Sequence, residues 1–438
     1  MFNKKKLLII TSITSLAMSA EAAAFAPTNL LTSHDYAIRL PQNKHDHRFN
    51  FGMYKLEGGC KNTGRTWDEK RVNILALHNP TQSTLAMIKK PIHTANDFEV
   101  SSLDNFFAAR NIVDDGIRGN IKLAGKFEQL DASLYADYQF VQDFFGDWSL
   151  SVHVPVTYKK VSGFVWQDLT PEPGNASQAY SYINNFLIHT QLTDKFLANV
   201  KKFGGLDLSN WSKTGVGDVV ALLNWQAMFG ENEKDNYHMF ELHGKAGVSF
   251  PTSEQKDEDQ AFSMALGNDG AWGIPFGFGF ALQPASMMRL GADVELLVLI
   301  DKARVRRLMT NESQTEFTLL NTGWAKKTHG FTWQFHGWMQ LYHLMDGLSF
   351  SAGYQYVFHG RDWLEVNTTS GFEVPTINKA NSLKEWHVHN ALFKMNYDFL
   401  QYNDSGFSPH ISVFYKLPFD GKNIIDTSTW GGQLTLSF

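Results

Sequence analysis

Apolar and polar residues alternate along most of the chain after about residue 119, as they do in β-strands with one apolar face. The longest unbroken run puts Trp148, Leu150, Val152, Val154, Val156 and Tyr158 on one face and Ser149, Ser151, His153, Pro155 and Thr157 on the other. A tight turn at 143–147 joins this run to the preceding one at 130–140. The apolar phase changes between Phe127 and Leu130 without a turn residue, which predicts a β-bulge within one long strand.

Further alternating runs cover residues 219–229, 240–250, 272–282, 289–298, 331–341, 348–358, 391–399, 411–417 and 429–438. The connections at 143–147, 230–236, 284–286, 345–346 and 400–408 are short, and those at 159–214, 251–271, 302–328, 361–383 and 419–427 are mostly long. Short periplasmic turns alternate with long external loops in outer-membrane barrels. The sequence therefore predicts an all-β fold, an antiparallel transmembrane β-barrel of about 12 strands over 118–438, or about 14 strands if 58–118 holds another hairpin.

The two ends of the chain indicate export to an outer membrane. Residues 1–24 combine basic Lys4 to Lys6, a short apolar run and small residues, as a secretory signal peptide does. An uncleaved anchor is disfavoured, because the run is shorter than the ~20 residues that span a bilayer. The last strand ends on Phe438 and resembles the closing strand of bacterial outer-membrane barrels. In that class it is the signal read by the barrel-insertion machinery.

Residues 25–117 form an N-terminal segment that holds a first strand near residue 49, followed by a loop, a lumenal plug or a further hairpin. The long connection at 159–214 contains apolar residues at helical spacing over 182–202, which predicts a helical insertion. We expect this insertion either to cap the barrel mouth or to pack on its rim.

The composition of the chain limits the classes of partner that it is expected to bind. Aromatic residues make up 14% of the chain, a load that suits a barrel surrounded by outer-membrane lipid. The net charge of -5 indicates no nucleic-acid partner. Cys60 is the single cysteine, so there is no intrachain disulfide. No cofactor is predicted.

Ionisable residues in the polar phases of the runs are predicted to face the lumen and to bind solute. They are Lys122, Lys126, Asp137, His153, Glu241, His243, Lys245, Arg289, Asp293, Glu295 and His336. Structural ion pairs within the wall are the alternative interpretation of the same residues.

The sequence offers only weak candidates for catalysis or metal binding. The sequence has no G-x-S-x-G, H-E-x-x-H or phosphate-loop motif. His153, His243 or His336 could act as a base with Asp137 or Glu241 and with Ser149, Ser151 or Ser249 as nucleophile, but nothing selects one combination. His45 with His47, and His387 with His389, are weak candidates for metal sites.

Three motifs carry a resemblance to a known family: Gly215-Val-Gly-Asp218, Gly247-Val-Ser-Phe-Pro-Thr-Ser-Glu254 and the run 148–156. In this order they resemble the outer-membrane proteins of a phenol-degradation pathway (MetA-type), which are related in architecture to the long-chain fatty acid transporters. Where that family usually continues its proline-threonine turn with glycine, this chain has Ser253. The resemblance implies passage or capture of small hydrophobic or aromatic molecules. A lipid or peptide hydrolase in the outer membrane is the alternative function.

Overall fold

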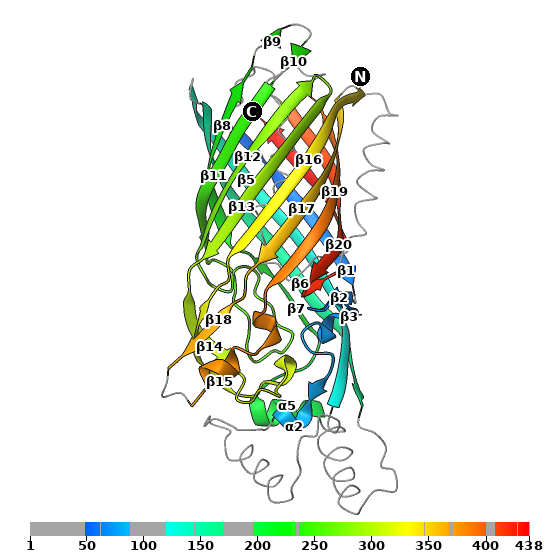
Figure 1. The fold of residues 1–438 in the computed structure, drawn as a ribbon, viewed down its shortest axis with the longest axis vertical. Helices are drawn as coiled ribbons and strands as arrows, with labels where there is room; N and C mark the ends of the chain where they lie inside the picture. The colour runs from blue at the N-terminus through cyan, green and yellow to red at the C-terminus, as the bar shows by residue number, and fades with distance from the viewer. Residues whose placement is uncertain are drawn as a thin grey trace, which may run out of the picture.

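The computed structural model describes residues 49–61, 63–87, 120–143, 146–169, 196–230, 232–233, 236–237, 239–345, 347–367, 371–399, 408–426 and 428–437. They form a closed antiparallel β-barrel (Figure 1). Its strands are β1 (Phe49–Lys61), β5 (Asn120–Asp143), β6 (Gly146–Asp168), β8 (Val219–Phe229), β11 (Met239–Phe250), β12 (Gly273–Ala285), β13 (Met288–Leu299), β16 (Thr332–Met345), β17 (Leu348–His359), β19 (Trp386–Asp398), β20 (Ser408–Lys422) and β22 (Thr429–Ser437). Counted over the described residues, the barrel has 12 strands, which confirms the lower of the two predicted numbers.

The strands follow one another around the barrel in chain order, and the first strand closes it. Strand β1 pairs with β22 on one side and with β5 on the other, both antiparallel. Along β5 the outward side chains from Leu130 to Phe140 include large exposed hydrophobic residues. Ten residues of a strand tilted by roughly 45° span about 25 Å of height, which matches the apolar belt of an outer-membrane barrel.

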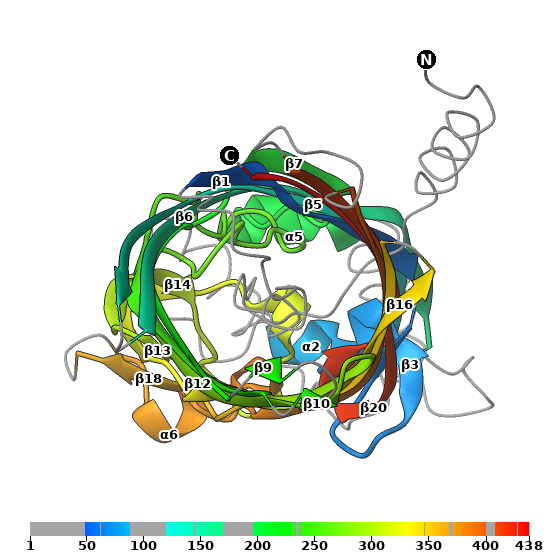
Figure 2. The same ribbon diagram turned by 90° about the horizontal axis from the view of Figure 1, so that it is seen from above.

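The two ends of the barrel differ as the connection lengths predict. One end, here the short-turn end, carries the β5–β6, β8–β11, β12–β13, β16–β17 and β19–β20 connections. The opposite, long-loop end carries additional elements. Seen from above, α2 and α5 lie within the outline of the ring, whereas α6 and β18 lie outside it (Figures 1 and 2). Those at the long-loop end are β2 (Thr63–Arg65), β3 (Arg71–Asn73), β4 (Gln82–Ser83), β7 (Trp211–Val216), β14 (Lys302–Arg307), β15 (Thr322–Thr328), β18 (Trp363–Val366), β21 (Ile424–Ile425), α2 (Thr84–Met87), α5 (Phe196–Gly204), α6 (Val374–Ile377), η2 (Ile74–Ala76), η4 (Glu316–Thr318) and η6 (Asn381–Leu383), while β9 (Asn232–Glu233) and β10 (Asn236–Tyr237) form a hairpin at the short-turn end.

The bulge predicted between Phe127 and Leu130 is wrong, although β5 is the single long strand that was expected. Phe127 and Gln129 are both buried and Leu130 is exposed, so the inward phase runs on without a change. The apolar residues that suggested a phase change belong to a core at the long-loop end. A bulge lies in β6 instead, where Gly163, at φ 61°, is an extra residue between two register pairs with β5.

The helical insertion is confirmed over α5, where Val200 is buried in the same core. The signal peptide, residues 25–48, 88–119 and 170–195, the cluster of His45 and His47, and Phe438 lie outside the described residues. Among the helices that the structure does describe, none combines the length and apolar character needed to cross a membrane.

Candidate functional site

The inner wall of the barrel is organised around β12, whose inward residues are almost all small. Gly273, Pro275, Gly277, Gly279 and Ala281 are buried and alternate with large outward residues. In the register, Gly279 lies between His243 of β11 and Asp293 of β13. A Cβ atom on Gly279 would lie 2.3 Å from both His243 Nε2 and Asp293 Oδ1. Glycine therefore leaves the space in which the two flanking strands bring their side chains together.

Charged side chains of β11 and β13 meet in pairs across β12: Lys245 with Glu295, His243 with Asp293, and Glu241 with Arg289. The His243 Nε2 to Asp293 Oδ1 distance is 2.5 Å, and His243 Nδ1 lies 3.1 Å from Glu241 Oε1. All of these side chains are buried. Six of the predicted site residues are therefore brought together in one ladder, in which each carboxylate has a lysine, arginine or histidine partner.

Strand β16 continues this ladder with two aromatic residues that the sequence interpretation missed. Trp338 Nε1 donates to Asp293 Oδ2 at 2.8 Å, and the Arg289 guanidinium lies 5.6 Å from the centre of the Trp338 ring. Arg289 also donates to Tyr342 Oη at 3.3 Å. Both aromatic residues occupy the inward phase of β16, and that phase was the signal that could have identified them.

His336 lies beside the ladder without completing it. Its Nδ1 is 3.7 Å from Asp293 Oδ2, and its Nε2 is buried with no hydrogen-bond partner among the described residues. The Oε1 atom of Gln340 is likewise buried without a hydrogen-bond partner among the described residues. Nearby, Gln355 Nε2 donates to Gln334 Oε1 at 3.1 Å. This part of the wall can therefore offer donors and acceptors to a water molecule or a polar solute.

The predicted residues on β5 and β6 form a separate polar group. Asp137 accepts from Ser149 Oγ at 2.8 Å, and Asn224 Nδ2 donates to Ser149 and Ser151 at 3.3 and 3.0 Å. His153 is buried and stacks on Tyr135, with ring centroids 5.8 Å apart. Asp137 and His153 thus face inward as predicted, on a different part of the wall from the charged ladder.

Two predicted lumenal residues face the opposite way. Lys122 and Lys126 are exposed, whereas Ile121, Leu123 and Phe127 beside them are buried. The inward orientation predicted for both lysines is therefore wrong. At this height the interior is filled by the long-loop apolar core rather than by polar residues, so the polar face of the strand is the outer one.

Neither His243 nor Ser149 forms the predicted catalytic combination. His243 lies between two carboxylates, and Ser149 donates to Asp137 rather than to a histidine. Over the residues that the structure describes, no group of three or more His, Cys, Asp or Glu side chains is arranged to hold a metal ion. His387 and His389 lie in an outward aromatic cluster, where His389 Nδ1 is 2.7 Å from Tyr354 Oη.

A cavity of about 400 Å³ lies at the long-loop end, where loops and strand ends meet. One side is apolar and belongs to the buried core around Leu75, Phe127, Val161 and Phe262. The polar part of its lining contains Gln129, Lys159, Lys256, Glu258, Asp269, Arg307, Glu316, Lys327, His329, His359, Asp362 and Lys384. A cavity of this size and mixed lining is typical of small-molecule sites.

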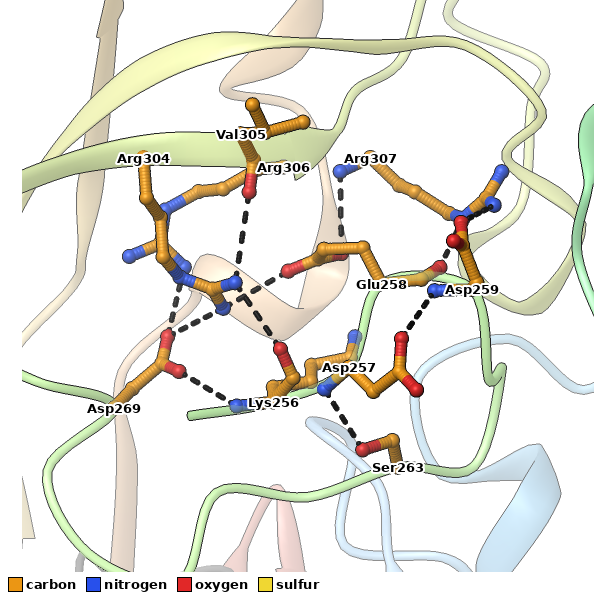
Figure 3. A network of polar contacts seen from close by, with 10 residues as sticks. All are labelled: Lys256, Asp257, Glu258, Asp259, Ser263, Asp269, Arg304, Val305, Arg306 and Arg307. Atoms are coloured by element: carbon orange, nitrogen blue, oxygen red, sulfur yellow. Dashed lines mark hydrogen bonds and ion pairs between the residues drawn. The ribbon is translucent and has the colours of Figure 1, made fainter. Parts of the chain in front are cut away.

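Arginines of β14 fix the loop that forms one side of this cavity (Figure 3). Arg304 and Arg306 both contact Asp269 Oδ2, at 2.7 and 2.9 Å. Arg307 donates to the carboxylate of Asp259 at 3.0 Å and to the backbone of Glu258. Burial alone would raise the pKa of Asp269, but the two guanidinium charges outweigh burial and lower it. The loop at 251–272 is thereby held against β14 by several charge-assisted contacts.

A second polar group holds the β17–β19 connection. Asp362 accepts from Lys327 Nζ at 2.6 Å and lies 3.1 Å from His359 Nε2, while His359 Nδ1 is 2.7 Å from Thr332 Oγ1. Burial would raise the pKa of Asp362, but its contacts with His359 and Lys327 lower it. Burial, aided by the charge of Lys327, lowers the pKa of His329 to about 4. His329 is therefore neutral at neutral pH.

The three resemblance motifs converge at this end of the barrel. Asp218 accepts from the backbone N–H groups of Ser253 and Asn268, at 3.0 and 2.5 Å. Thr252 Oγ1 donates to the carbonyl of Gly217 at 2.9 Å, and the Gly217 N–H donates to the carbonyl of Pro155. The motifs therefore form a junction that joins β6, β8 and the loop after β11.

Comparison with known proteins supports the fold. No family model and no curated protein matches the chain. The COG4313 outer membrane channel from Pseudomonas putida F1 covers 91% of this chain and 100% of its own length, with a TM-score of 0.51 and 8% identity. The NanC porin covers 70% of this chain and 93% of its own, at 8% identity and a TM-score of 0.30. A Pseudomonas aeruginosa FadL homologue covers 89% of each chain, at 10% identity and a TM-score of 0.27.

These identities are low, so the likeness to the first of these structures shows the fold alone. The chain therefore has the fold of a closed antiparallel β-barrel with an exposed apolar belt and a buried polar inner wall, the architecture that outer-membrane barrels share.

Proposed function

We propose that the protein is an outer-membrane channel or transporter for small, mainly hydrophobic or aromatic solutes. The observation that carries this proposal is the cavity of about 400 Å³ at the long-loop end. Its lining joins loop residues to Gln129 and Lys159, which are inward residues of barrel strands, so a molecule held there lies at the mouth of the barrel. A cavity with one apolar side at the mouth of the barrel is a defect in packing unless a ligand fills it, and this favours a binding role.

The same proposal names the partners that surround the protein. Outer-membrane lipid surrounds the apolar belt, and the barrel-insertion machinery reads the last strand. The polar inner wall, including the predicted site residues that face inward, contacts the solute below the cavity. The motif resemblance to phenol-degradation-pathway proteins supports an aromatic solute.

Reconstitution tests this function. The refolded protein in planar bilayers should give discrete conductance steps, and in liposomes it should accelerate uptake of phenol or benzyl alcohol relative to an equal mass of unfolded protein. Membranes that stay non-conducting, together with uptake equal to that of the unfolded control, would contradict a channel.

One observation favours the barrel-enzyme alternative. Thr332, His359 and Asp362 form a linked hydroxyl, imidazole and carboxylate at the long-loop end, and His359 and Asp362 line the cavity. Thr332 is only 1% exposed and lies outside the lining, which limits access to its hydroxyl. Release of p-nitrophenol from a short-chain p-nitrophenyl ester, abolished by Thr332→Val, would establish this alternative.

A further inference from the structure

The loop-end cavity contains a buried lysine that forms no close ion pair with a carboxylate of the described residues. Lys159 is 8% exposed and lines the cavity. Its Nζ donates to the backbone carbonyl of Ala265 at 2.7 Å. Among the described residues no carboxylate forms an ion pair with it, and Asp131 and Asp218 act on it only from farther away. An ammonium group carries three donors, and the backbone carbonyl of Ala265 is the one acceptor that Lys159 Nζ has among the described residues.

The register places this ammonium next to the apolar side of the cavity. Val161 pairs with Phe127, and Lys159, the next inward residue of β6, pairs with Gln129. Phe127 and Val161 are buried members of the apolar core. Because β6 runs from the long-loop end towards the short-turn end as its numbers fall, Lys159 lies on the barrel side of these two residues. The cavity is thus apolar at one side and cationic at the side nearest the barrel.

We propose that this cavity binds small amphipathic organic acids, with the acid group on Lys159 Nζ and the apolar body against Phe127 and Val161. The proposal rests on the proposed channel function and narrows its substrate class from hydrophobic molecules in general to those that carry an anionic head. A buried ammonium with open donors gains most from a carboxylate, since charge-assisted hydrogen bonds are the stronger class. The order along β6 directs the anionic head of the solute towards the barrel.

One residue of the cavity, Glu316, favours a ligand of the opposite charge. Glu316 accepts from the backbone N–H of Ser382 at 2.7 Å, and its Oε2 is buried without a hydrogen-bond partner among the described residues. A cationic ligand would use this carboxylate. Lys159 is preferred as the anchor because it adjoins the apolar side of the cavity directly through the β5–β6 register.

Three probes that share one apolar body separate these outcomes: 4-phenylbutyrate, 4-phenylbutanol and 4-phenylbutylamine. Their affinities for the full chain, purified and folded in detergent, are measured by calorimetry. The acid should bind more tightly than the alcohol, and Lys159→Met should weaken acid binding roughly tenfold to a hundredfold while leaving alcohol binding nearly unchanged. Lys160→Met is the matched control, because this neighbour faces outward and pairs with Glu128.

Equal affinities for acid and alcohol, or preference for the amine, would overturn the proposal. So would a Lys159→Met variant that is less stable yet keeps the acid preference, because Lys159 would then be only a counter-ion for Asp131 and Asp218. If Lys159→Met does not fold, the same affinities are measured for Lys159→Arg, which retains the charge and should therefore still bind the acid more tightly than the alcohol. Binding in detergent needs no transport. If the barrel conducts but shows no preference for the acid, the acid-binding proposal is refuted and the channel function stands. If the protein binds the acid but does not conduct, the channel function is refuted and the acid-binding site stands.

Discussion

Replacing Gly279 with alanine tests whether the small residues of β12 hold the charged ladder together. The added Cβ would lie 2.3 Å from His243 Nε2 and from Asp293 Oδ1, so each must retreat by about 1 Å to reach ordinary contact. Their 2.5 Å contact would then be broken. His243 keeps its contact with Glu241, and Asp293 keeps the hydrogen bond from Trp338, so the cost is that of one buried hydrogen bond to a charged group, about 1.5–3 kcal/mol.

Gly244→Ala is the matched control, because it makes the same change on the neighbouring strand. A Cβ there would meet Gly277 O at 3.5 Å, an ordinary distance. Unfolding by guanidinium in detergent, followed by tryptophan fluorescence, should show Gly279→Ala unfolding at a clearly lower denaturant concentration than both the native protein and Gly244→Ala. Coincident unfolding of the two variants would refute the explanation of β12, since an alanine normally stabilises a strand relative to glycine.

Three further predictions concern charge. Lys245→Met leaves Glu295 buried without its cation, so the free energy of unfolding should fall by about 3–5 kcal/mol, and reversal potentials in planar bilayers should show a higher selectivity for cations. Adding Glu295→Gln to this variant should undo most of both effects. Asp269→Asn should make the loop at 251–272 roughly tenfold more sensitive to trypsin, whereas Asp259→Asn, at a carboxylate that is 76% exposed, should not. Burial lowers the pKa of His329 from 6.5 to about 4, so the folded protein favours the neutral imidazole, and the free energy of unfolding should fall by about 3 kcal/mol as the pH drops from 6.5 to 4. His329→Asn should reduce this loss when denaturant midpoints are compared at pH 7 and 4.5.

The alternation along the chain was sufficient to predict the barrel, because a period of two divides residues between lipid and interior regardless of what fills that interior. It also placed Glu241, His243, Lys245, Arg289, Asp293, Glu295 and His336 on the inner wall. The same argument failed for Lys122 and Lys126. It assumes a polar interior at every height, and at the long-loop end the interior is an apolar core.

The partners of each inward residue could not be predicted, because strand register and the size of the middle residue decide them together. His243 reaches Asp293 across Gly279 although 50 residues separate them in the sequence. The cavity is harder still to foresee. Lys159, Phe262, Glu316 and Trp386 come from four separate connections or strands, and no local pattern indicates that they share a lining.

The sequence by itself predicted that lipid-facing residues alternate with inward ones along each strand, that the barrel has about 12 or about 14 strands, and which end carries the long loops. These properties are local, since each depends on alternation and on the length of one connection. Only the tertiary structure decided that β11 and β13 pair their charges above β12, and that a buried lysine adjoins an apolar cavity at the long-loop end. Both depend on the distances between side chains of different strands, which closure of the barrel sets.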